Sequence, residues 1–175
     1  MLALLGGCGR VGFESALDID AHRCNPTDPC MPPYQMAGSS CYRISTNFMT
    51  WPEAEADCEK DCAHLATVDG YVEHVTLHGQ SSDAQVTEIW IGYTDLATEG
   101  TFRWVSPGGL DPLDPSFGKC FFGPAGANNT PGADCVVQES VDVCGDWFVR
   151  DCGLARPYIC ERDGNPADPT SYTSH

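Results

Sequence analysis

The chain has 175 residues, of which 11 are Cys, and its 9 Lys and Arg against 25 Asp and Glu give a formal charge of −16. A surface this acidic repels phosphate backbones, which excludes nucleic-acid binding through a basic footprint. The length accommodates one ordinary domain with short tails. So many cysteines indicate an oxidising, extracytoplasmic compartment, where disulfides persist.

The first nine residues form a short apolar run that ends in small residues around Cys8. They resemble the lipobox of bacterial lipoproteins, which implies a signal remnant over residues 1–8 and a lipid anchor on Cys8. A start further upstream and a plain apolar tag stay open, because the run is shorter than a signal h-region and no cation precedes Arg10. No segment has the roughly 18 apolar residues that span a bilayer. We therefore expect a secreted or membrane-anchored bacterial protein without a transmembrane span.

The folded unit is expected over residues 30–162. The preceding segment, residues 9–29, is acidic and contains several prolines, so it is predicted to be an extended linker. The tail, residues 163–175, has the same polar character and is predicted to be disordered.

Two helices are predicted in the first half of this unit. Over residues 51–60, Thr50 is placed to cap the helix, and apolar residues at i, i+3 and i+7 form one buried face. Over residues 70–78, Val72, Val75 and Leu77 are expected to point inward. That helix also carries His74 and His78 at a spacing that can hold zinc, but we interpret both as surface residues.

The second half reads as short strands and one long loop. Runs rich in β-branched and aromatic residues predict strands at 89–93, 102–105, 135–138, 146–149 and 157–160. The stretch from about Ser106 to Asp134 is rich in Gly and Pro and has little periodicity. A compact domain rarely keeps so long an irregular loop without a functional or architectural reason.

Ordered motifs along residues 30–162 resemble the C-type lectin-like domain in its long form, which has an N-terminal hairpin. The motifs, in chain order, are Cys41-Tyr42, the Trp51/Ala54/Cys58 helix, His64-Leu65-Ala66, Trp90-Ile91-Gly92, Glu99–Trp104, Asp134-Cys135-Val136, Trp147 with Cys152, and Tyr158–Glu161. The resemblance implies an α+β fold with two helices, small antiparallel sheets and a long irregular loop. It also implies that Trp51, Trp90, Trp104 and Trp147 serve core packing rather than sugar stacking.

The same resemblance implies three disulfides. They pair Cys58 with Cys160, Cys135 with Cys152, and Cys30 with Cys41. The remaining cysteines outside the lipobox are Cys24, Cys62, Cys120 and Cys144, and four cysteines allow three pairings that the sequence does not separate. A zinc site built from these four is the disfavoured alternative, because they lack paired C-x-x-C spacing.

Sugar-binding members of the family coordinate sugar through Ca²⁺ in the long-loop region. The resemblance places their ligands at Gly126-Ala127-Asn128, at Ala133 and at Phe148-Val149, where only Asn128 matches. No Glu occurs between Glu99 and Glu139, and Ca²⁺ needs about six to eight oxygen ligands, several of them carboxylates. We therefore expect no primary sugar-coordinating calcium site.

Some members of the family also bind a second Ca²⁺ ion at an auxiliary, structural site. The resemblance places its ligands at Asp95, Glu99 and Asp134, although Glu99 could equally be structural because the Glu-Gly pair also occurs in members without calcium. No other cofactor is expected. For ligand binding, Asn128, Asn129 and Asp134 in the long loop are the candidates, because rigid scaffolds commonly carry function on loops.

The functional expectation is an extracytoplasmic, non-catalytic recognition module for a carbohydrate or an extracellular protein. No nucleophile motif or paired-carboxylate pattern supports an enzyme. The alternative is a disulfide-stabilised structural protein of the cell envelope with no soluble ligand.

Overall fold

The protein is built around one β-sheet. The computed structural model describes residues 30–112, 114, 121–122, 130, 132–140 and 147–173 of the chain. The elements are β1 (Gln35–Ala37), β2 (Ser40–Met49), α2 (Trp51–Glu59), β3 (His64–Leu65), α3 (Tyr71–Asp83), β4 (Glu88–Thr94), β5 (Arg103–Trp104), β6 (Cys135–Glu139), β7 (Trp147–Arg150), β8 (Arg156–Arg162) and the 3-10 turn η2 (Pro169–Ser171). These bounds confirm the α+β class and the two predicted helices. The β1, β2 and β3 strands have no counterpart among the predicted runs.

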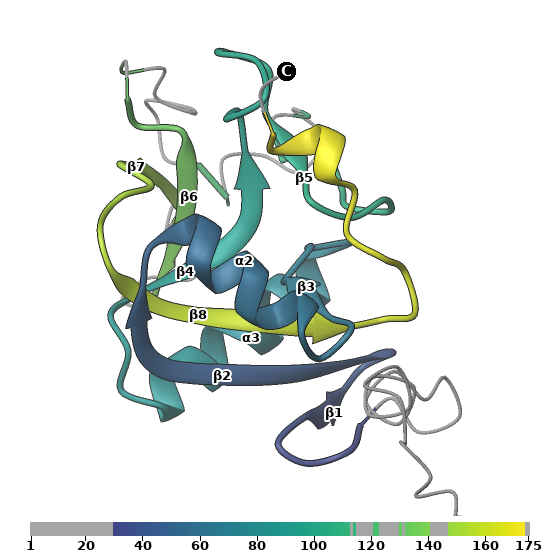
Figure 1. Cartoon of the computed structure of the whole chain (residues 1–175). Coiled ribbons are helices and arrows are strands. Elements are labelled where there is room, and N and C mark those ends of the chain that lie inside the picture. Colours follow the sequence, from purple (N-terminus) through teal and green to yellow (C-terminus); the bar gives the residue numbers. More distant parts are fainter. Residues whose placement is uncertain are drawn as a thin grey trace, which may run out of the picture.

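Within the described residues the strand order is β1-β2-β8-β4-β6-β7, with β3 pairing with β8 and β5 with β4. The long β2 strand runs antiparallel to β8. The β8 strand in turn lies parallel to β4, with Trp90 opposite Tyr158. In Figure 1, α2 crosses in front of β8 and α3 lies behind it. The central strands are therefore covered on both faces, and Trp51, Trp90 and Trp147 are buried, as predicted.

The α2 helix begins where the sequence predicts. The Glu53 carboxylate accepts hydrogen bonds from the Thr50 N–H at 3.0 Å and from its hydroxyl at 2.7 Å, so the first turn is closed by a side chain. Trp51, Ala54 and Cys58 are fully buried. The Trp51 indole also donates to the Ile91 carbonyl at 2.9 Å, which ties the helix to β4.

The α3 helix presents a different face to the core from the predicted one. Val72 is 80% exposed and Val75 is also exposed, so their predicted inward orientation is wrong. The buried side chains are His74, Leu77 and Ser81. The His74 ring meets the ring of Phe121 edge-on at 5.0 Å and that of Trp147 at 5.6 Å. The interpretation of His74 as a surface residue is therefore wrong, because these aromatic partners from distant segments outweigh its polarity.

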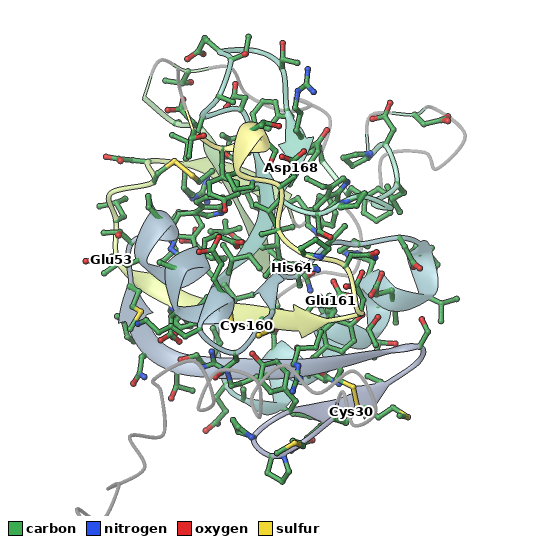
Figure 2. The ribbon with its side chains drawn as sticks, turned by 45° about the vertical axis from the view of Figure 1, so that its right-hand side comes forward. Cys30, Glu53, His64, Cys160, Glu161 and Asp168 are labelled. Carbon is green, nitrogen blue, oxygen red and sulfur yellow. A yellow bond between two sulfur atoms is a disulfide. The ribbon has the colours of Figure 1, made fainter. Side chains whose placement is uncertain are left out.

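The three predicted disulfides are present, and Figure 2 shows the sulfur atoms. They join Cys58 to Cys160, Cys135 to Cys152, and Cys30 to Cys41. Cys62 is disulfide-bonded as well, so it is not available as a zinc thiolate. Cys8, Cys24, Cys120 and Cys144 lie outside the described residues.

The C-terminal tail packs against the domain through residue 173, so the prediction of disorder is wrong for this stretch. The Asp168 N–H donates to the Val105 carbonyl at 2.6 Å. Tyr172 packs edge-on against Trp51 with 5.8 Å between ring centroids, and its hydroxyl donates to Glu59 at 2.6 Å. The order comes from the surface of α2 and the segment after β5, which the tail's own polar composition does not reveal. The linker over 9–29 lies outside the described residues.

Candidate functional site

Three carboxylates meet at the end of β4. The β4 strand pairs antiparallel with β6, and Thr94 lies opposite Cys135, so Asp95 and Asp134 become neighbours. The Asp95 N–H donates to the Asp134 carbonyl at 3.1 Å, and the Thr94 hydroxyl donates to the same carbonyl at 2.6 Å. Strand pairing thus joins two acids that are far apart in the sequence.

A tight turn after Asp95 brings in the third acid. The Gly100 N–H donates to Asp95 Oδ2 at 2.7 Å, and the Thr98 N–H donates to the Asp95 carbonyl at 2.9 Å. Gly100 has a φ of +78°, a conformation that glycine adopts without strain. One carboxylate oxygen from each of Asp95, Glu99 and Asp134 lies within 4.8 Å of the other two. The three predicted auxiliary residues therefore form one cluster, which we call the acidic cluster.

Two carboxylate oxygens of the acidic cluster are available to coordinate a metal ion. Asp95 is only 2% exposed, and the buried Oδ1 atoms of Asp95 and Asp134 have no hydrogen-bond partner among the described residues. Burial raises the pKa of Asp95, and the negative charges of Asp134 and Glu99 raise it further. Ca²⁺ prefers hard oxygen ligands and relieves repulsion of this kind. The residues present therefore fit a calcium ion, with backbone carbonyls or water completing the coordination.

The described positions of the primary sugar-coordinating site offer no additional carboxylate. At the start of β6, Ala133 precedes Asp134. In β7, Val149 is buried. The Arg150 guanidinium lies over the Phe148 ring, with its Cζ atom 4.7 Å from the ring centroid. Of the predicted ligand-binding set only Asp134 is described, because Asn128 and Asn129 lie outside the described residues.

A buried polar network lies beside β8 and was not singled out from the sequence. The ring nitrogens of His64 approach the Leu65 carbonyl at 2.9 Å and Asp163 Oδ1 at 3.2 Å. The neighbouring Glu161 accepts a hydrogen bond from the Thr67 N–H at 2.8 Å (Figure 2). Burial raises the pKa of Glu161 to about 7, although the His64 charge opposes the shift. His64 and Glu161 are both buried, so this network contributes to stability rather than to a ligand site.

Comparison with known proteins finds similarity to animal lectins. Over 133 residues, 75% of this chain, it is 30% identical to the C-type mannose receptor 2 of Homo sapiens. Over 121 residues, 69% of this chain, it is 31% identical to C-type lectin domain family 4 member F of Mus musculus. The aligned regions span only 8% and 21% of those relatives. Because these relatives are animal proteins, they do not support the expected bacterial context.

Solved structures give the same fold. The trimeric Kupffer cell C-type lectin receptor Clec4f superimposes with a TM-score of 0.61 at 27% identity, covering 84% of this chain and 94% of that one. A calcium-independent type II antifreeze protein superimposes with a TM-score of 0.62 at 23% identity, covering 79% and 95%. Across the described residues, no helix is both long and apolar enough to cross a membrane.

The family model for the lectin C-type domain matches residues 47–162, which include both helices and all strands from β3 to β8. The fold, the three disulfides and this match agree. The chain belongs to the C-type lectin domain family.

Proposed function

We propose that this protein is an extracytoplasmic, non-catalytic recognition module that binds a carbohydrate or protein ligand without a sugar-coordinating calcium ion. C-type lectin domains are typically recognition modules, and the fold matches that class. The observation that carries the calcium-free part is the chemistry of the primary-site positions. Ala133, Phe148 and Val149 offer no side-chain oxygen, and the Asn128 amide with the Asp134 carboxylate cannot supply the several carboxylates that Ca²⁺ requires.

A glycan array probed with and without EDTA tests this proposal, together with a screen of extracellular proteins. Binding that is unchanged by EDTA is the expected result. Strong binding that EDTA abolishes would overturn the calcium-free mode. Absence of binding to every glycan and every surface protein would instead favour the alternative, a disulfide-stabilised structural protein with no soluble ligand.

We propose a structural role for the acidic cluster, as an auxiliary calcium site apart from the ligand. Calcium there would neutralise three converging carboxylates and hold the turn at residues 95–100 against the start of β6. Calcium should therefore raise the melting temperature of the wild type. Asp95→Asn should remove that increase, whereas the exposed Asp83→Asn, with the same change in charge, should keep it. No calcium uptake at millimolar concentration in isothermal titration would refute the site.

The disulfides support display outside the cytosol, because such bridges persist in oxidising compartments. Lipidation of Cys8 and the contact role of Asn128 and Asn129 stay predictions, since all three lie outside the described residues. Intact mass spectrometry of the native protein, before and after reduction, measures both the lipid and the number of bridges.

A further inference from the structure

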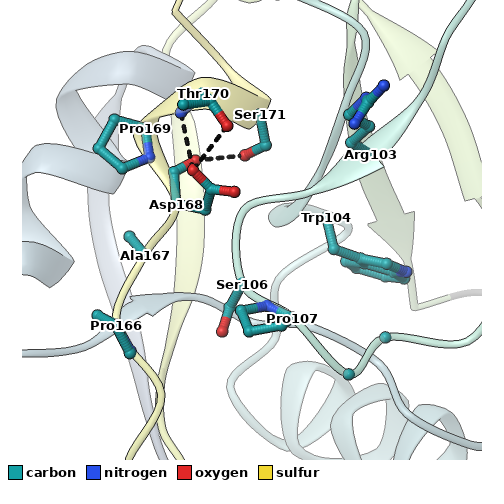
Figure 3. A pocket seen from close by; sticks show the side chains of 12 residues that line it. Arg103, Trp104, Ser106, Pro107, Pro166, Ala167, Asp168, Pro169, Thr170 and Ser171 are labelled. Carbon is teal, nitrogen blue, oxygen red and sulfur yellow. Dashed lines mark hydrogen bonds between the residues drawn. The ribbon is translucent and has the colours of Figure 1, made fainter.

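The ordered tail forms one wall of a pocket that lies partly beyond the segment matched by the lectin family model. The opposite wall is the segment from β5 to Gly109, and the pocket has a volume of about 570 Å³, within the usual range for small-molecule sites (Figure 3). The tail wall runs from Pro166 to Ser171. Because the match ends at residue 162, the tail wall is a feature of this chain rather than of the matched domain.

Both walls are fixed in place. On the tail side, the Asp168 backbone is held by its hydrogen bond to Val105. On the other side, the Trp104 indole donates to the Leu110 carbonyl at 2.7 Å. A Cβ on Gly109 would collide with the Trp104 ring, so only glycine lets the chain turn this closely. A site held this way loses little conformational entropy when a ligand binds.

A buried hydroxyl lines the pocket without a partner. Ser106 is 2% exposed, and its Oγ makes no hydrogen bond within the described part of the chain. Figure 3 shows its side chain directed toward the tail wall. A buried polar group left without a hydrogen bond destabilises the folded state, and a ligand hydroxyl in the pocket would satisfy it.

Opposite charges lie across the pocket. The Arg103 side chain is exposed and, unlike those of the other Lys and Arg residues in the described part of the chain, makes no hydrogen bond or ion pair there. On the tail wall, Asp168 Oδ1 accepts from the Thr170 N–H at 3.0 Å and from its hydroxyl at 2.7 Å. Its Oδ2 makes no hydrogen bond to any described residue. The pocket therefore offers one donor group and one acceptor group that are both available to a ligand.

This combination favours an uncharged, hydroxyl-rich ligand. The charges of Arg103 and Asp168 balance, and a hydroxyl group can accept from the first and donate to the second. Three prolines, Pro107, Pro166 and Pro169, add apolar surface for the C–H faces of a ring. The net charge of −16 disfavours anionic ligands by long-range repulsion. We propose that this pocket binds a neutral sugar residue without calcium, a proposal that rests on the recognition function above and assigns it a site.

Glycan binding by the full chain in EDTA tests the site, with neutral oligosaccharides of hexoses and N-acetylhexosamines as probes. Arg103→Gln and Asp168→Asn should each weaken binding by about tenfold or more, because each removes a charge-assisted hydrogen bond. Ser106→Ala should weaken it less. Lys60→Gln, which removes an exposed cation that follows α2, should bind like the wild type.

The two main variants should fold like the wild type. Both alter exposed side chains. The amide introduced by Asp168→Asn would also keep an oxygen that can accept the hydrogen bonds from Thr170. Melting temperatures should therefore not change, and a loss of binding would report on the pocket itself.

The outcomes separate this inference from the broader function. Neutral-glycan binding that both variants retain would place the ligand elsewhere, which overturns the pocket and leaves the recognition function standing. Binding restricted to sialylated or sulfated glycans would overturn the neutral-sugar assignment. If the wild type binds no glycan but captures an extracellular protein, the pocket proposal fails alone. If it binds neither, both proposals fail.

Discussion

Removal of the Cys58–Cys160 disulfide should destabilise this protein more than removal of either other described bridge. The bond joins α2 to β8 and closes a loop with a sequence separation of 102 residues, against 17 for Cys135–Cys152 and 11 for Cys30–Cys41. A disulfide stabilises mainly by restricting the unfolded chain, and longer loops lose more entropy.

The loop lengths set the size of the effect. The chain-entropy relation gives about 4.7 kcal/mol for the bond between Cys58 and Cys160, about 3.1 kcal/mol for Cys135–Cys152 and about 2.8 kcal/mol for Cys30–Cys41. Double Cys→Ala replacement of the first pair should therefore cost about 1.6 kcal/mol more than replacement of the second. Both pairs are buried, so the packing losses are similar and largely cancel in the comparison.

Equilibrium unfolding in urea measures each double variant against the wild type, with circular dichroism and tryptophan fluorescence as independent probes. Coincident transitions from the two probes establish that a single free energy is defined. If replacing the shorter Cys135–Cys152 bridge costs as much as replacing the longer one, loop entropy does not govern these bonds. Packing in the native state would then account for most of their contribution.

Three further changes test other parts of the structure. Gly92→Ala places a Cβ 2.5 Å from a backbone carbonyl of β3, so urea unfolding should show a loss of about 1–3 kcal/mol. Tyr172→Ala removes the ring contact and hydrogen bond that hold the tail, and should cost about 1–2 kcal/mol and expose the tail to limited proteolysis. The pKa of Glu161 rises from its usual 4.5 to about 7 on folding, so the folded state binds extra protons and stability should fall as pH increases from about 4.5 to about 7. The raised pKa of His64 acts in the same direction, and Glu161→Gln should flatten the dependence of melting temperature on pH; an unchanged slope would refute this assignment.

Local sequence patterns predicted most of the secondary structure, because the capping residues and the residue types of the strands act over a few positions. For α3 they predicted the helix but not the face that it buries, because hydrophobicity favoured Val72 and Val75 as inward residues. The buried set there follows the i, i+3, i+7 spacing of His74, Leu77 and Ser81. That spacing was present in the sequence, but a histidine and a serine on it gave no apolar signal. The partners that bury His74 come from segments near residues 121 and 147.

Of the two candidate sites, the residues of one were identified from the sequence, and the other was found only in the structure. Asp95, Glu99 and Asp134 were identified from the family resemblance, but their convergence depends on the pairing of β4 with β6, a contact between residues some 40 positions apart. The pocket under the tail gave no sequence signal, because no motif connects Arg103 and Ser106 with Asp168.

By itself the sequence determined the acidic charge and, through ordered motifs, the fold and three of the disulfides, and its cysteine content indicated an oxidising compartment. Composition and short spacings carry that information because it is local or shared across a family. Only the tertiary structure decided that the polar tail packs on α2 and that the three carboxylates of the acidic cluster come together. Both depend on contacts between distant segments, whose free energy comes from surfaces that neither segment possesses alone.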